Sequence, residues 1–315
     1  MNNTPNTNCL TLRLLHAAKG YKAVAFDIFD TLLKRDCAHP ADLFALMEVT
    51  HQAALGFAGA RAAAEAETRQ TLGREVTLAE IYAHPALRGT DPATECAAEL
   101  AMIAPNRPVA QAAAACHARG QKVYAVSDMY LPKEQIEAML QKCGLDFLDG
   151  VFVSCEYGVQ KRSGKLFKLF LQQTALRPAE VLFVGDSPRA DFAGAALAGI
   201  RCFLLPQPTP LPYTKTPADA VGGAAIATLQ NCCQNLNPSA ALGAELLGPL
   251  AVGFATWLHG QRAAIPGAKL VFLARDMYLV RQVYQLLYPE EETFYLKESR
   301  QSLLPALLQC PMNEQ

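Results

Sequence analysis

Short apolar segments alternate with helical patterns through the middle of the chain. The apolar runs at 23–27, 122–126, 150–153, 181–184 and 201–205 have the length of buried strands, and helical segments separate the later ones. Strands that are apolar throughout, rather than alternating with polar residues, are typical of parallel sheets covered on both faces. The pattern therefore predicts an α/β fold, with a parallel sheet and right-handed crossovers.

A long alanine-rich segment, 36–104, lies between the first and second of these strands. It contains several helical patterns and no convincing strand, so we expect a helical insertion. Within it, Arg61, Glu65 and Arg69 recur every four residues. That spacing is typical of a solvated, ion-paired helix face, and a charged lip over a pocket fits it as well.

The other segments complete the predicted domain organisation. Residues 1–20 form an N-terminal segment, and 21–35 together with 105–206 form the core. Four prolines mark 207–222 as a linker. The rest, 223–315, is predicted to be a helical and partial α/β unit, because its VFLARDMYL repeats the pattern of VYAVSDMYL in the core.

One stretch of this C-terminal unit, Ala240–Gly260, is almost free of charge and long enough to span a membrane. Glu245 would lie within the apolar slab, and Pro249 and the glycines dilute the hydrophobicity. We therefore expect a buried helix and no membrane span.

Charge and cysteine usage narrow the class of protein. The formal net charge of the 315 residues is -1 and no long basic run is present, which argues against nucleic acid as a main partner. The ten cysteines form no CxxC pair, which is typical of reduced thiols in the cytosol. The first residues also lack a signal-peptide pattern, so the expected location is cytoplasmic.

Polar groups follow three of the predicted strands. Asp27, Ser127 and Asp186 each stand where a strand ends, and the carboxyl ends of parallel strands meet at one edge of a sheet. Lys161 precedes the helix that leads to the Asp186 strand. We expect these four groups to converge.

Together they are suited to phosphoryl transfer. Asp27 can act as a carboxylate nucleophile, and with Asp186 and Asp191 it offers the hard oxygen ligands that Mg²⁺ prefers. Ser127 can donate to a phosphoryl oxygen, and Lys161 can neutralise negative charge. Asp191 either ligates the metal or orients Lys161. The further candidate substrate contacts are Thr31, Asp128 and Arg61.

Four segments resemble the motifs of the haloacid dehalogenase (HAD) superfamily in their order along the chain. They are FDIFDT, VSDMY, KRSGKLF and VGDSPRADFAGAALAGI. The resemblance implies a Rossmann-like sheet in the strand order 5-4-1-2-3 with a helical cap inserted after strand one. It also implies Mg²⁺ held by Asp27, the main-chain oxygen of Phe29 and Asp186, and a small phosphorylated metabolite as substrate.

More narrowly, FDIFDTLL, SDMYLP and the later FLARD resemble a bacterial subgroup that often accompanies glycosyltransferases of surface-polysaccharide synthesis. This implies a sugar phosphate as one candidate substrate and a glycosyltransferase as a candidate partner.

One position departs from the superfamily. HAD phosphatases usually carry a second Asp two residues after the nucleophile as general acid and base, and here that residue is Phe29. General acid–base help is typically worth about 10²–10⁴-fold. Asp30, Asp128 or a cap residue could substitute, or the substrate could have a leaving group that needs no acid.

The resulting prediction is a Mg²⁺-dependent HAD phosphatase. Two alternatives remain. The first is a dehalogenase-type hydrolase, which would need no metal. The second is a HAD-derived binding module in polysaccharide synthesis, with little or no catalysis.

Overall fold

The structure is a computed structural model that describes residues 7–206 and 217–297. The chain forms two compact units, Met1–Pro238 and Ser239–Gln315, and each is described by itself. Most of the predicted linker, 207–216, lies outside the described residues.

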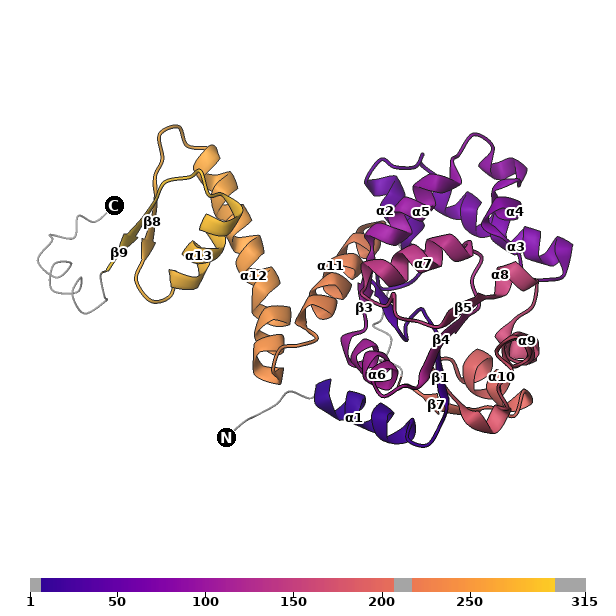
Figure 1. The fold of residues 1–315 in the computed structure, drawn as a ribbon. Helices are drawn as coiled ribbons and strands as arrows, with labels where there is room; N and C mark the ends of the chain where they lie inside the picture. The colour runs from indigo at the N-terminus through magenta and orange to yellow at the C-terminus, as the bar shows by residue number, and fades with distance from the viewer. Residues whose placement is uncertain (1–6, 207–216, 298–315) are drawn as a thin grey trace, which may run out of the picture. The chain divides into compact units, whose positions relative to one another are not determined.

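The first unit is built on a five-stranded parallel sheet in the order β5-β4-β1-β6-β7 (Figure 1). The strands are β1 (Ala23–Phe26), β4 (Lys122–Ser127), β5 (Gly150–Val153), β6 (Val181–Gly185) and β7 (Arg201–Leu204). Ala23 of β1 pairs with Lys122 on one side and with Val181 on the other. The predicted α/β fold class and the strand order 5-4-1-2-3, counted over these five strands, are confirmed.

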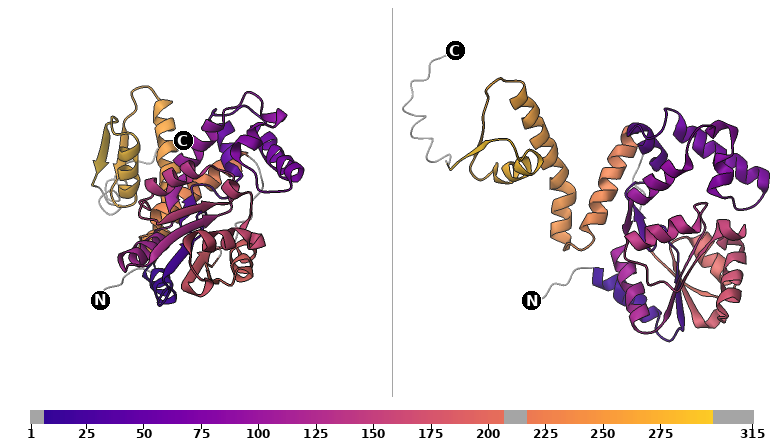
Figure 2. Two further views of the ribbon diagram at one scale, coloured as in Figure 1. Left: turned by 45° about the vertical axis from the view of Figure 1, so that its right-hand side comes forward. Right: turned by 45° about the horizontal axis from the view of Figure 1, so that its top comes forward.

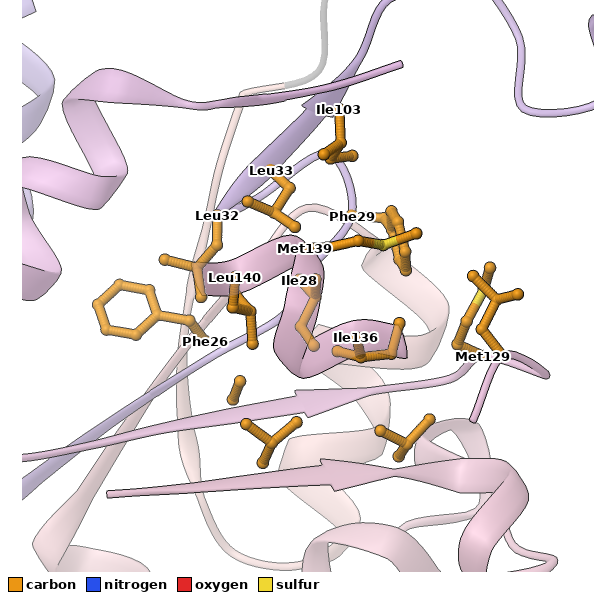
Figure 3. Close-up of a cluster of buried hydrophobic side chains, with 14 of the residues drawn as sticks. Phe26, Ile28, Phe29, Leu32, Leu33, Ile103, Met129, Ile136, Met139 and Leu140 are labelled. Carbon is orange, nitrogen blue, oxygen red and sulfur yellow. The ribbon is translucent and has the colours of Figure 1, made fainter. Parts of the chain in front are cut away.

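Helices cover both faces of this sheet because its central strands carry apolar side chains on both sides. In β1, Val24 and Phe26 join one buried cluster, and Ala23 and Ala25 join the other. The first cluster is covered by α1 (Thr7–Ala17), α6 (Arg107–Ala118) and α7 (Lys133–Lys142), and the second by α9 (Lys165–Thr174) and α10 (Gly194–Leu197). Figure 3 shows part of the first cluster, where Ile136, Met139 and Leu140 of α7 pack around Ile28.

The predicted helical insertion forms a cap between two short strands that the sequence analysis missed. Its helices are α2 (Asp42–Val49), α3 (Phe57–Leu72), α4 (Leu78–Tyr82), the 3₁₀ turn η1 (Pro85–Leu87) and α5 (Pro92–Ala101). They lie together beside the sheet-and-helix core (Figure 2). The strands β2 (Leu33–Arg35) and β3 (Ile103–Pro105) pair antiparallel at the base of the cap. Each of these strands has three residues, which is too short for the alternation of apolar and polar residues that predicts a strand.

Helix α11 (Pro217–Cys233) packs against α2 and β2 within the first unit. Asn231 donates to the carbonyl oxygen of Arg35 at 3.1 Å and to Asp36 Oδ1 at 2.8 Å. The contacts of α11 therefore hold the base of the cap in place.

The second unit contains α12 (Pro238–Ala263), β8 (Leu270–Leu273), α13 (Tyr278–Leu287) and β9 (Thr293–Leu296). The two strands are parallel, and Ala255, Phe272 and Tyr284 form the buried cluster. This unit therefore has the strand–helix–strand pattern that the repeated motif indicates.

Helix α12 departs from the expectation of a buried helix. By length and composition alone it could cross a membrane, with a mean hydropathy of 1.4, and 11% of that stretch is buried. Leu242, Leu246 and Leu250 are exposed, whereas Ala251 and Ala255 are buried. The apolar composition concealed that only one narrow side of the helix packs on its own unit.

Candidate active site

Three carboxylates and one ammonium group meet at the carboxyl edge of the sheet. One oxygen from each of Asp27, Asp186 and Asp191 lies within 4.8 Å of the others. Lys161 Nζ lies 2.7 Å from Asp27 Oδ1 and 2.6 Å from Asp191 Oδ1. The structure thus brings together the predicted nucleophile, the predicted lysine and the two further acids, because β1 and β6 are neighbours in the sheet.

Asp191 is fully buried and has both oxygens engaged. Its Oδ2 accepts hydrogen bonds from the backbone N–H groups of Asp186 and Ser187, each at 2.9 Å, while Oδ1 faces Lys161. Asp191 lies in the π-helical turn η4 (Pro188–Ala193), for which Ser187 is the N-cap residue. It therefore fixes the loop that carries Asp186 and also orients Lys161.

Two glycines make this arrangement possible by close approach. A Cβ on Gly185 would lie 2.4 Å from Asp191 Oδ2, and a Cβ on Gly194 would lie 2.3 Å from the carbonyl oxygen of Lys161. Real Cβ atoms do not come so close, so a larger residue would displace the Asp191 carboxylate at position 185 or the Lys161 backbone at position 194.

Thr31 and Asp128 lie against the same cluster. Thr31 Oγ1 donates to Asp186 Oδ1 at 3.2 Å, and Asn106 holds the Thr31 carbonyl oxygen at 2.7 Å. Asp128 Oδ1 accepts the backbone N–H of Lys161 at 2.8 Å. These contacts orient the cluster, and substrate contact by Thr31 and Asp128 remains a prediction. Ser127, at the end of β4, is buried.

Arg61 belongs to the interior of the cap. Its guanidinium forms a bidentate pair with Glu95, at 2.6 and 2.9 Å, and a third bond with Glu65 at 2.8 Å. The side chain is fully buried. A solvated helix face is therefore the wrong interpretation at this position, because Glu95 from α5 supplies a buried counter-charge that the spacing within α3 could not reveal.

The side chain of Phe29 lies under an arginine. The guanidinium of Arg35 is 3.9 Å from the centre of the ring, and Arg35 pairs with Glu99 at 3.1 and 3.2 Å. The neighbouring Asp30 adopts a left-handed backbone with φ of 57° and is exposed, as expected of a turn residue. Phe29 offers no proton to a leaving group, and metal binding by its main-chain oxygen remains a prediction.

Burial and mutual repulsion set the charge state of the cluster. Burial raises the pKa of Asp27 to about 7; Lys161 opposes the rise, and Asp191 and Asp186 add to it. Burial lowers the pKa of Lys161, but Asp27 and Asp191 outweigh this and raise it overall. Burial also raises the pKa of Asp128. Lys161 therefore stays charged, and further positive charge beside Asp27 would favour its carboxylate form.

The donor set fits a hard divalent cation such as Mg²⁺. Three carboxylates face one ammonium group, so negative charge is in excess. Asp27 Oδ1 and Asp191 Oδ1 are buried and share the single ammonium group of Lys161. Carboxylate oxygens are the hard ligands that Mg²⁺ prefers. Asp27, Asp186 and Asp191 are the side chains that would hold it.

Two residues near the cluster escaped the sequence analysis. Glu75, between α3 and α4, accepts a hydrogen bond from Gln160 Nε2 at 2.6 Å, and Gln160 directly precedes Lys161. No motif marks either residue, because their contact joins the cap to the core across 85 positions of the chain.

Comparison with known proteins places these observations in a family. The family model described as "haloacid dehalogenase-like hydrolase" matches residues 21–199. The bovine (Bos taurus) "haloacid dehalogenase-like hydrolase domain-containing protein 3" is 32% identical over 97 residues, which are 30% of this chain and 38% of that protein. Phosphoserine phosphatase of Thermus thermophilus is 41% identical over 51 residues, 16% of this chain and 20% of that protein. The chain thus spans less than two fifths of either relative.

Two solved structures are similar at lower identity. A HAD phosphatase from Thermococcus onnurineus has 21% identity and a TM-score of 0.44, covering 59% of this chain and 86% of its own. The L-2-haloacid dehalogenase of Xanthobacter autotrophicus has 21% identity and a TM-score of 0.42, covering 58% and 76%. Likeness at this level carries no argument about function.

Proposed function

The chain belongs to the haloacid dehalogenase-like hydrolases, and we propose that within this family it is a Mg²⁺-dependent phosphatase. Its substrate would be a small phosphorylated metabolite, with sugar phosphates as the first class to test. The observation that carries the proposal is the cluster of Asp27, Asp186 and Asp191 around Lys161.

In the proposed reaction, Asp27 is the nucleophile. Its carboxylate oxygen forms a bond to phosphorus while the ester P–O bond breaks and the alcohol oxygen leaves with the bonding electrons. Water then attacks the aspartyl-phosphate, which releases inorganic phosphate and restores Asp27. Over both steps one water is consumed, and one alcohol and one phosphate are formed.

The other residues assist without changing covalently. Bound Mg²⁺ would supply charge neutralisation between the phosphate and the carboxylates. Lys161, ion-paired with Asp27 and Asp191, contributes a fixed positive charge beside the nucleophile. Ser127, the last residue of β4, would donate to a phosphoryl oxygen, and Thr31 donates its hydroxyl to Asp186.

The leaving oxygen needs a proton from a group other than Phe29. Asp30 is exposed and its nearest cation, Lys34, is 3.9 Å away. Asp128 suits the task better, because it is a half-buried carboxyl group beside Ser127 and burial raises its pKa. If Asp128 supplies the proton, Asp128→Asn should slow the cleavage of alkyl phosphates more than that of aryl phosphates, whose leaving groups need no acid.

A test of the proposal compares p-nitrophenyl phosphate hydrolysis with and without Mg²⁺, and for Asp27→Asn. We expect turnover only with the metal and loss of turnover in the variant. A panel of sugar phosphates would then narrow the substrate. No hydrolysis in Mg²⁺, or hydrolysis that survives Asp27→Asn, would refute the phosphatase.

The dehalogenase remains a second candidate because the aromatic Phe29 stands where most HAD phosphatases have an acid. Halide release from a 2-haloacid, measured in the presence of a chelator, distinguishes the two. Release without metal would favour the dehalogenase over the phosphatase.

A further inference from the structure

A row of charged side chains runs through the cap. It begins at the buried pair of Glu95 and Arg61, continues from Arg61 to Glu65 at 2.8 Å, and passes from Glu65 to Arg69. Each acid in the row lies between two basic or polar groups. The side chains of the row therefore hold one another in place, because Arg61 and Glu65 each contact a neighbour on either side.

The row leaves the cap at Glu75 and enters the core. Arg69 donates to Glu75 Oε1 at 2.9 Å, and Gln160 Nε2 donates to Glu75 Oε2 at 2.6 Å. Gln160 is the residue before Lys161, whose own N–H is held by Asp128 at 2.8 Å. Contacts between charged or polar groups thus connect the interior of the cap with Gln160, whose backbone leads directly into Lys161.

We propose that Glu75 and Gln160 are positioning residues that hold Lys161 against Asp27 and Asp191 only while the cap is seated on the core. The inference rests on the proposed function in one respect, since it assigns Lys161 a part in that reaction. It adds a cap residue, Glu75, on which the placement of Lys161 depends.

The burial of Glu75 makes its bond to Gln160 a strong one. The residue is 3% exposed, so its carboxylate has little access to water and depends on protein donors. Arg69 satisfies one oxygen and Gln160 the other. Hydrogen bonds to charged groups are the stronger kind, and loss of one donor leaves a buried charge partly unpaired.

The same face of the cap has a second bond to the core. The backbone N–H of Leu78, three residues after Glu75, donates to the carbonyl oxygen of Tyr130 at 2.8 Å. Tyr130 lies two residues after Asp128, which holds the Lys161 N–H. Separation of cap and core would break both bonds, and the Lys161 turn would lose its support from the cap.

The experiment compares Gln160→Ala and Glu75→Ala with the control Glu80→Gln. Glu80 lies in the same cap segment and pairs with Arg74 at the surface. We expect kcat for p-nitrophenyl phosphate to fall roughly ten- to hundredfold in Gln160→Ala and Glu75→Ala, as loss of a charged hydrogen bond implies. KM should change less than about threefold, and Glu80→Gln should behave as the wild type.

Two comparisons separate positioning from general loss of structure. Glu75→Gln keeps an acceptor oxygen for Gln160 and should retain more activity than Glu75→Ala. The double variant Glu75→Ala/Gln160→Ala should be no slower than the slower single variant, because both changes break the same bond. Multiplying effects in the double variant would contradict the inference, and so would equal losses in Glu75→Gln and Glu75→Ala.

A readout without turnover tests the placement of Lys161 directly. Acylation of Lys161 by sulfo-N-hydroxysuccinimidyl acetate, followed by peptide mass spectrometry, should be slow in the wild type because the side chain is 2% exposed. It should be several-fold faster in Gln160→Ala and unchanged in Glu80→Gln. If Lys161 is acylated faster in Gln160→Ala but the wild type has no phosphatase activity, the proposed function is refuted and the positioning of Lys161 is not. Unchanged acylation and unchanged kcat in Gln160→Ala would refute the positioning.

Discussion

Replacing Gly194 by alanine tests how tightly the Lys161 turn is packed. Gly194 has a helical backbone, with φ of -63°, so alanine by itself would stabilise the helix by about 1 kcal/mol. The new Cβ, however, would lie 2.3 Å from the carbonyl oxygen and 2.9 Å from the carbonyl carbon of Lys161. These are backbone atoms, so no side chain can rotate out of the way.

The clash should outweigh the gain in helix propensity. Overpacking of a buried site costs about 1–3 kcal/mol, and so short an approach belongs at the upper end. Subtracting the helical gain leaves a net loss of about 2 kcal/mol, or roughly 4–8 °C in Tm for a unit of this size. A displacement of Lys161 by about 1 Å would lower kcat roughly 10²-fold.

Gly59→Ala is the matched control. Gly59 lies within α3, and a Cβ there would meet no described atom within 4 Å. The free energy of unfolding of this variant should rise by about 0.5–1 kcal/mol, and its activity should be unchanged. Far-ultraviolet circular dichroism should follow unfolding, because the single tryptophan, Trp257, lies in α12 and reports on the other unit. A Gly194→Ala protein with unchanged kcat and a Tm at or above that of the wild type would refute the packing argument.

Three further results are expected. Glu95→Ala should lower the free energy of unfolding by about 3–5 kcal/mol in urea, because it leaves a fully buried guanidinium without its bidentate partner; a loss under about 1 kcal/mol would contradict the account. A hydrogen bond from Arg74 lowers the pKa of Glu80 to about 2, so this carboxylate stabilises the fold above its unfolded pKa of about 4.3 and loses that effect as the pH falls through 2. Glu80→Gln should remove this pH dependence of the free energy of unfolding, which amounts to less than about 1 kcal/mol because the pair is partly exposed. An acid unfolding curve that is the same in Glu80→Gln and in the wild type would contradict this prediction. Burial raises the pKa of the Cys155 thiol to about 12, so iodoacetamide at neutral pH should alkylate Cys155 far more slowly than the exposed Cys232 in the native protein, and comparable rates would contradict its burial.

The sequence predicted the sheet because the strands are marked in two ways. Each core strand is a short apolar run; β4 ends at Ser127, and Asp27 and Asp186 directly follow β1 and β6. Parallel pairing then places those ends at one edge, so the convergence follows from topology. The spacing of Lys161 within its motif supplied the fourth group.

The cap contacts could not be predicted in the same way. Arg61 is buried because Glu95, 34 positions away, faces it, and Glu75 meets Gln160 from 85 positions away. Pairing of this kind depends on how helices pack, and neither periodicity nor a motif encodes it. The exposure of α12 was not predicted for a related reason. The sequence of an apolar helix does not show whether its apolar side chains are buried or exposed.

The most direct test of the proposed chemistry is to trap the covalent intermediate. Enzyme mixed with p-nitrophenyl phosphate and Mg²⁺ is quenched in acid within the turnover time, digested, and mapped by mass spectrometry. The account predicts a phosphoryl group on the peptide that contains Asp27, present with Mg²⁺, absent with a chelator and absent in Asp27→Asn. A phosphoryl group on another residue, or substrate turnover with an unmodified Asp27 at every quench time, would contradict it.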